Sequence, residues 1–154
     1  MKKFNRYKNQ LYKQGKYNPV NESKYIGRGR PEYRSSWELK FFTWCDRNPN
    51  VLEWSSESVI VPYKSPVDNR YHRYYVDNAV ALQEGNNIIR YLVEIKPYKQ
   101  TLPPVQSKRK KKSTLLYESR TYAVNQSKWE AAEKYAKRKG MKFIILTEKE
   151  LNIK

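Results

Sequence analysis

Glu94 and Lys96 are the residues whose types and spacing point most directly to chemistry. They are separated only by Ile95, at the end of an apolar run typical of a strand. Successive strand residues point to opposite faces, so the Glu94 carboxylate and the Lys96 ammonium share one face and Ile95 points into the core. Asp77 lies within an earlier run of the same kind. Two carboxylates beside a lysine suit a site that holds a divalent cation through oxygen ligands and polarises a water molecule.

Asp77 is expected inside a strand that runs from Tyr71 to Leu82, on the face of Tyr75 and Ala79. A lone buried carboxylate costs several kcal/mol unless it is paired or metal-bound. We therefore interpret Asp77 as functional, with a surface-facing aspartate on an open face as the alternative. For Lys96 the alternative is a plain salt bridge to Glu94 or another nearby acid.

Composition limits what such a site could act on. The 154 residues fit one domain, and 32 Lys and Arg against 15 acids give a formal charge of +17. Such an excess, interleaved with 14 tyrosines, favours nucleic acid as partner, with ribosomal or membrane-surface roles as alternatives. Cys45 is the single cysteine, which excludes an internal disulfide and indicates a reducing compartment. No apolar run reaches the roughly 20 residues of a membrane span.

Residues 1–34 form the first of two expected regions, a basic, tyrosine-rich N-terminal arm. Its basic residues are interspersed with tyrosines such as Tyr17 and Tyr25, and the apolar residues follow neither a helical nor a strand period. We expect this arm to be extended or partly ordered until it binds DNA, with a solvated tail as the alternative.

Residues 35–154 form the second region, in which helical and strand patterns alternate. A helix is expected from Ser35 or Ser36 to just before Pro49, and a capping box with Ser35 is the structural alternative for Glu38. Later helical and strand signals, bounded by turn residues, predict the following elements: strands at 51–54, 58–63, 71–82 and 88–96, an exposed basic loop at 107–113, a helix from Ser127 to Gly140, and a buried strand at 142–147.

This order of elements resembles the restriction-endonuclease-like core of the PD-(D/E)XK superfamily. Within it, residues 35–151 are similar to the TnsA-type endonuclease N-terminal domain. The chain is similar over nearly its whole length to the head completion nucleases of large tailed phages. The resemblance is carried by these segments: Trp37-Glu38-Leu39-Lys40, Tyr74-Tyr75-Val76-Asp77, Val93-Glu94-Ile95-Lys96-Pro97, Asn125-Gln126-Ser127-Lys128-Trp129 and Phe143-Ile144-Ile145-Leu146-Thr147-Glu148. Val76 stands where the superfamily name has a proline.

The resemblance implies an α/β fold with a central mixed sheet, an antiparallel meander plus a C-terminal strand, flanked by helices. It implies that Asp77 and Glu94 bind magnesium, with manganese as a second candidate ion, and that Lys96 positions or activates the attacking water. Glu38 is an additional acid that reaches the metal or the water, and Gln126 is an auxiliary residue of the site. The implied function is hydrolysis of phosphodiester bonds in double-stranded DNA during head completion, after packaging and before tail attachment. The implied location is the virion, at the capsid or portal vertex beside head or neck proteins, and the host cytoplasm during assembly.

Two other functions fit the same residues. A non-catalytic portal plug or DNA-terminus clamp could keep the nuclease fold and use the same charge. An RNA-binding protein is a third hypothesis, although neither an RRM-type nor a KH signature is present. His72 is the only histidine, which excludes a histidine-metal cluster, and Cys45 within an apolar stripe argues against a thiol hydrolase.

Overall fold

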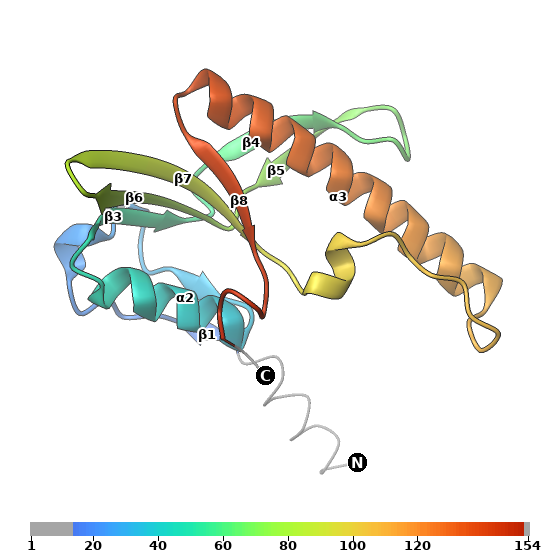
Figure 1. The fold of residues 1–154 in the computed structure, drawn as a ribbon, viewed down its shortest axis with the longest axis horizontal. Coiled ribbons are helices and arrows are strands. Elements are labelled where there is room, and N and C mark those ends of the chain that lie inside the picture. Colours follow the sequence, from blue (N-terminus) through green and yellow to red (C-terminus); the bar gives the residue numbers. More distant parts are fainter. Residues whose placement is uncertain (1–13, 153–154) are drawn as a thin grey trace, which may run out of the picture.

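The computed structural model describes residues 14–152, which form an α/β fold around a four-stranded mixed sheet (Figure 1). The strand order is β3-β6-β7-β8, with β8 parallel to β7 and the other pairs antiparallel. The sheet strands are β3 (Val51–Ser56), β6 (Asn78–Glu84), β7 (Asn87–Ile95) and β8 (Lys142–Leu146). The expected fold class, a mixed sheet flanked by helices, is confirmed.

Helix α2 (Ser36–Arg47) covers one face of this sheet (Figure 1). Ser35 is its N-cap, and its side chain accepts a hydrogen bond from the Glu38 N–H at 3.2 Å, as the capping-box pattern predicts. Phe42 and Cys45, both 0% exposed, pack with Trp54 and Val93 of the sheet. This core fixes the helix against the sheet, and its first turn lies near the end of the sheet that carries Asp77.

Helix α3 (Lys112–Arg138) lies across the opposite face, where Trp129, Ala132 and Ala136 are buried against the sheet and a neighbouring hairpin (Figure 1). The expected start at Ser127 is wrong, because the helix begins 15 residues earlier, at the end of the basic run. Its first half projects beyond the sheet, so burial imposes no apolar periodicity there, and Ser127 lies mid-helix. Within residues 14–152, no helix is both long enough and apolar enough to span a membrane.

The predicted strand 71–82 is interrupted at Val76 and Asp77, and this interruption shapes the candidate site. Strands β4 (Ile60–Lys64) and β5 (Tyr71–Tyr75) form a separate two-stranded hairpin, so the antiparallel strands are divided between this hairpin and the four-stranded sheet. Residues 57–59 lie opposite residues 76–77 between the flanking pairs Ser56↔Asn78 and Ile60↔Tyr75. The one extra residue on the 57–59 side is typical of a β-bulge, which bends strands and re-aims side chains, often beside active sites. Asp77 therefore sits in a bend and not in the middle of a strand.

Residues 14–34 pack onto the domain, with β1 (Gly15–Lys16), η1 (Glu22–Lys24) and β2 (Glu32–Tyr33) as their regular elements. The Tyr25 ring lies 4.7 Å from the Trp54 ring, centroid to centroid, and Tyr17 contacts Phe42 and Trp54. The expectation of a partly ordered arm is therefore wrong for residues 14–34, because their tyrosines complete the core. The rest of that arm, residues 1–13, lies outside the described residues. A last short element, η2 (Tyr98–Thr101), follows β7.

Candidate functional site

Asp77, Glu94 and Lys96 come together where β7 ends beside the bulge. The Asp77 Oδ2 accepts a hydrogen bond of 2.8 Å from the backbone N–H of Ile95, the residue between Glu94 and Lys96. The Lys96 Nζ lies 3.3 Å from the Glu94 Oε1. Ile95 packs into the α2-side core, as the alternation predicts. The structure thus places Asp77, Glu94 and Lys96 at one end of the sheet, and their role as a common site stays a prediction.

Tyr74 is a fourth member of this cluster. Its hydroxyl donates a 2.5 Å hydrogen bond to the Glu94 Oε2, so both carboxylate oxygens of Glu94 have partners. Burial, followed by the negative charge of Glu94, raises the pKa of Tyr74 far above its ordinary value, which keeps the phenol a donor at every physiological pH. The Lys128 Nζ, from α3, lies 5.6 Å from the centroid of the Tyr74 ring and 5.7 Å from that of Tyr63.

The two carboxylates interact unfavourably in the absence of a cation. Burial and then the negative charge of Glu94 raise the pKa of Asp77 well above its ordinary value. The hydrogen bond from Ile95 and the charge of Lys96 act in the opposite direction but do not outweigh them. A divalent cation would relieve this repulsion, and Mg²⁺ commonly takes one or two protein carboxylates and keeps several waters. The donor set therefore fits magnesium.

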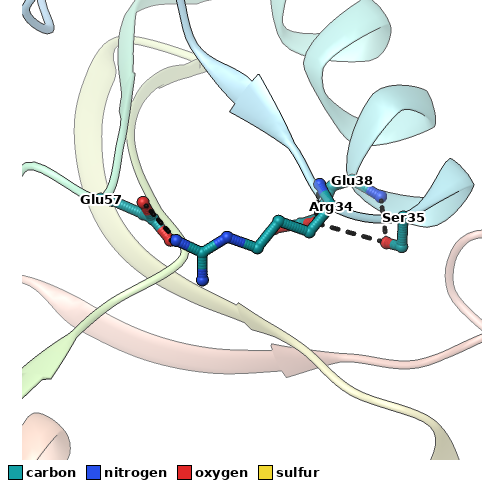
Figure 2. Close-up of polar contacts among 4 residues, drawn as sticks. All are labelled: Arg34, Ser35, Glu38 and Glu57. Atoms are coloured by element: carbon teal, nitrogen blue, oxygen red, sulfur yellow. Dashed lines mark hydrogen bonds and ion pairs between the residues drawn. The ribbon is translucent and has the colours of Figure 1, made fainter. Parts of the chain in front are cut away.

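Glu38 lies near this pair but is engaged in capping α2 (Figure 2). Its Oε2 accepts hydrogen bonds from the Arg34 N–H at 2.7 Å and from the Ser35 hydroxyl at 3.4 Å. Burial, followed by the charge of Glu57, raises the pKa of Glu38, and the charge of Glu38 in turn raises that of Asp77. Glu38 thus contributes negative potential to the site while its carboxylate serves the helix N-terminus.

Glu57 is an acid of this region that the sequence did not single out. Its side chain pairs with the Arg34 guanidinium at 3.1 Å (Figure 2). Its backbone N–H donates to the Asp77 carbonyl at 3.0 Å. Its φ of 52° is a left-handed conformation that glycine usually adopts, which is typical of a bulge position. No local sequence pattern indicates that Glu57 and Tyr74 lie at this site, because their positions depend on how the bulge orients the hairpin.

Gln126 and His72 lie outside the cluster. Gln126 is exposed on α3 and lines a cavity of about 390 Å³ that contains none of the site carboxylates; Thr101, Trp129, Glu130, Glu133, Phe143 and Ile145 line the rest. The His72 Nε2 is 2.7 Å from the Asp68 Oδ2 at the far end of the hairpin. Among residues 14–152, no three His, Cys, Asp or Glu side chains form a group that could hold a metal ion. The described site therefore offers a carboxylate pair, with Glu38 outside ligand contact.

A sequence model of the TnsA-like endonuclease N-terminal domain matches residues 48–148. The chain belongs to this family. It is also similar to the head completion nuclease of Enterobacteria phage T4, with 40% identity over 140 residues, covering 87% of this chain and 90% of that protein. The family resemblance inferred from the sequence is confirmed. Both matches are to nucleases, which supports a nuclease role for this TnsA-like chain.

The matched range also bears on the individual residues. Asp77, Glu94, Lys96 and Gln126 fall within residues 48–148, whereas Glu38 falls before them. The three clustered residues lie in the part of the TnsA-like chain that the family model covers. Their catalytic roles stay predictions, as do those of Glu38 and Gln126.

Proposed function

We propose that this protein is a metal-dependent DNA endonuclease that hydrolyses phosphodiester bonds at the Asp77–Glu94–Lys96 cluster. The observation that carries the proposal is the convergence of two carboxylates and a lysine at the bulged end of the sheet. The family match supports the reaction class independently.

Asp77 and Glu94 would hold the metal, with magnesium as the proposed ion and manganese as a second candidate. The fit rests on two acidic side chains at one end of the sheet, whose carboxylate oxygens are the ligand type that magnesium prefers. When bound, such an ion neutralises charge on the phosphate and lowers the pKa of a bound water. The free carboxylate oxygen of Asp77 and the oxygens of Glu94 are the available donors.

The other groups of the cluster orient the two carboxylates and offer hydrogen-bond donors to the substrate. Lys96, with its Nζ 3.3 Å from Glu94, keeps further N–H donors for the attacking water or a phosphate oxygen. The Tyr74 hydroxyl holds the Glu94 carboxylate in one orientation through its 2.5 Å hydrogen bond. The Ile95 N–H does the same for Asp77. This preorganisation keeps the donor atoms in place before substrate binds.

We further propose that the enzyme acts in phage head completion, after DNA packaging and before tail attachment. The support is the similarity to a protein named head completion nuclease over most of both chains. Its substrate is then double-stranded DNA, which the +17 charge suits. Its partners are head, portal-vertex or neck proteins, and its location is the virion, with the host cytoplasm during assembly. No role at a membrane is proposed.

The test is cleavage of plasmid DNA with and without Mg²⁺. Asp77→Asn, Glu94→Gln and Lys96→Met should each lower the cleavage rate by at least about 100-fold, the usual scale for losing one preorganised catalytic group. Glu84→Gln, at the far end of β6, and Lys142→Met, on β8, are matched controls that should cut at wild-type rates. Equal cutting by all six proteins would exclude this site as the catalytic centre.

The clamp that lacks cleavage is the second candidate function. It is favoured by one observation, that the described residues provide a carboxylate pair and not a group of three. An assay of phage assembly with the Glu94→Gln variant distinguishes the clamp from the nuclease. A clamp tolerates Glu94→Gln, because the amide keeps the shape of the side chain, whereas a working nuclease does not.

A further inference from the structure

The β4–β5 hairpin has an outward face that no interaction within the described residues accounts for. Its inward side chains Val61, Tyr63 and Tyr74 are buried in the core beneath α3. The alternate residues point away from that core, and all of them are exposed. We call these residues the outward hairpin face: Ile60, Pro62, Lys64, Tyr71, Arg73 and Tyr75.

This face combines aromatic rings with positive charge. Tyr71 is 75% exposed and Tyr75 is 47% exposed, although large aromatic side chains are usually well buried. The register places Lys64 opposite Tyr71, and Arg73 lies between the two tyrosines along β5. Neither cation forms an ion pair with a carboxylate of residues 14–152.

The face carries no acid of its own. The hairpin's one carboxylate, Asp68 in the turn, is bound by His72 and by the Arg70 N–H. An anionic partner therefore meets two free cations without an opposing negative charge.

One end of the outward hairpin face lies close to the candidate site in the sequence. Tyr75 precedes Asp77 by two residues, and its neighbour Tyr74 points inward to Glu94. The hairpin projects from the bulged end of the sheet and is packed against α3 (Figure 1). Tyr75 is therefore the member of this face nearest the candidate site along the chain, with Arg73 and Tyr71 further along β5.

We propose that the outward hairpin face binds unpaired nucleotides next to the cleavage site, with Tyr71 and Tyr75 stacking on bases and Lys64 and Arg73 contacting phosphates. The inference rests on the proposed nuclease function and specifies its substrate as DNA that carries a single-stranded segment or end. Aromatic rings on an open strand surface, with cations between them, are the usual means of binding exposed bases. Reading of an intact duplex would instead use side chains that hydrogen-bond to base edges in a groove, and this face offers few.

The test measures binding without cleavage, using fluorescence anisotropy in a Glu94→Gln background. Three labelled probes of one sequence are compared: a single strand, a blunt duplex and a duplex with a single-stranded overhang. The Tyr71→Ala/Tyr75→Ala pair should weaken binding to the single strand and the overhang by about tenfold or more. Binding to the blunt duplex should stay unchanged, because its bases are stacked on one another. Ile88→Ala, an exposed strand residue at the far end of β7, is the control for truncation.

A second pair identifies the role of the ring. Tyr71→Phe/Tyr75→Phe keeps the stacking surface and should retain wild-type affinity for all three probes. Equal weakening on the blunt duplex, or no weakening on any probe, would overturn the proposal. Loss of affinity in the Phe pair would also overturn it, since hydroxyl contacts would then carry the binding. If cleavage survives in the Asp77 and Lys96 variants while these binding results hold, the catalytic assignment fails and the hairpin inference stands.

Discussion

The two proposed metal-binding carboxylates, Asp77 and Glu94, lower the stability of the metal-free protein. Burial of Asp77, followed by the negative charge of Glu94, raises the pKa of Asp77. A folded-state pKa above the unfolded value means that the folded protein binds more protons between the two values, so its stability falls as pH rises. The metal-free protein therefore carries a cost at neutral pH that only a cation or a proton relieves.

Asp77→Asn should accordingly stabilise the protein when no metal is present, while it abolishes cleavage. The amide keeps an acceptor for the Ile95 N–H and removes the negative charge facing Glu94. We expect a gain of about 1 kcal/mol at pH 7, or about 2–4 °C in thermal midpoint, measured by calorimetry in EDTA. The gain should vanish below about pH 3.9, where the carboxyl of Asp77 is protonated in both states.

Glu53→Gln is the control for this prediction, because Glu53 lies 2.6 Å from the Arg90 guanidinium and is not repelled by a second acid. It should not stabilise the protein. A destabilised Asp77→Asn protein in EDTA would mean that the pair is already neutralised by neighbouring groups, which would weaken the case for a metal.

Among the elements, the segment before α2 is joined to that helix by hydrogen bonds to one buried carboxylate, in addition to the packing of its tyrosines. Asp46 is 0% exposed, and its oxygens accept hydrogen bonds from the Tyr17 hydroxyl, the Val20 N–H and the Asn21 N–H at 2.7–2.9 Å. Burial raises the pKa of this carboxyl, but these hydrogen bonds and the charge of Lys24 outweigh burial, and the pKa lies below its ordinary value. The segment is thus part of the folded unit.

Asp46→Ala should therefore lower the free energy of unfolding by about 3 kcal/mol, because it leaves several buried donors without an acceptor. Tyr17→Phe removes a single donor and should cost about 1 kcal/mol. Urea denaturation measures both. The lowered pKa means that the contribution of Asp46 is present above about pH 3.9 and is lost as pH falls through the folded-state value. An unchanged unfolding free energy in Asp46→Ala would show that residues 14–34 dock independently of the core.

The sequence predicted the elements whose side chains follow a burial period, and it missed those set by tertiary bends. Helix α2 follows its helical period and the Glu94–Lys96 face follows strand alternation. Strand β8 was predicted from a continuous apolar run, but its apolar side chains are only half-buried and not fully buried as expected. The bulge at Glu57 has no such signature, so Asp77 was expected in mid-strand and Tyr74 was overlooked. The first half of α3 was missed because its outer turns are solvated, with Tyr117 71% exposed.

At the scale of the whole molecule, the densest run of positive charge in the sequence is the basic loop that leads into α3. The basic loop before α3 lies at the far end of the projecting helix (Figure 1). The first turn of α3 contains Lys112 and no acid, the reverse of what the helix dipole favours. The Lys110 Nζ forms an ion pair with Glu118 at 2.8 Å. The other cations of the loop form no ion pair within residues 14–152, so they can contact phosphates.

We therefore expect the basic loop to contribute more to DNA binding than its share of the net charge. Two variants each exchange four exposed cations for glutamine, one in the loop and one elsewhere. The loop set is Lys108, Arg109, Lys111 and Lys112, and the control set is Lys40, Arg47, Lys137 and Lys142.

Removing one cation that binds a phosphate should reduce the slope of log affinity against log salt by about 0.9 on duplex DNA. The loop set should thus flatten the slope by about 2 to 4 units, and the control set should leave it nearly unchanged. Equal flattening of the slope by both sets would contradict localised binding, which depends on which four cations are removed. It would mean that the positive charge acts as a uniform field, whose effect depends only on how many cations are removed.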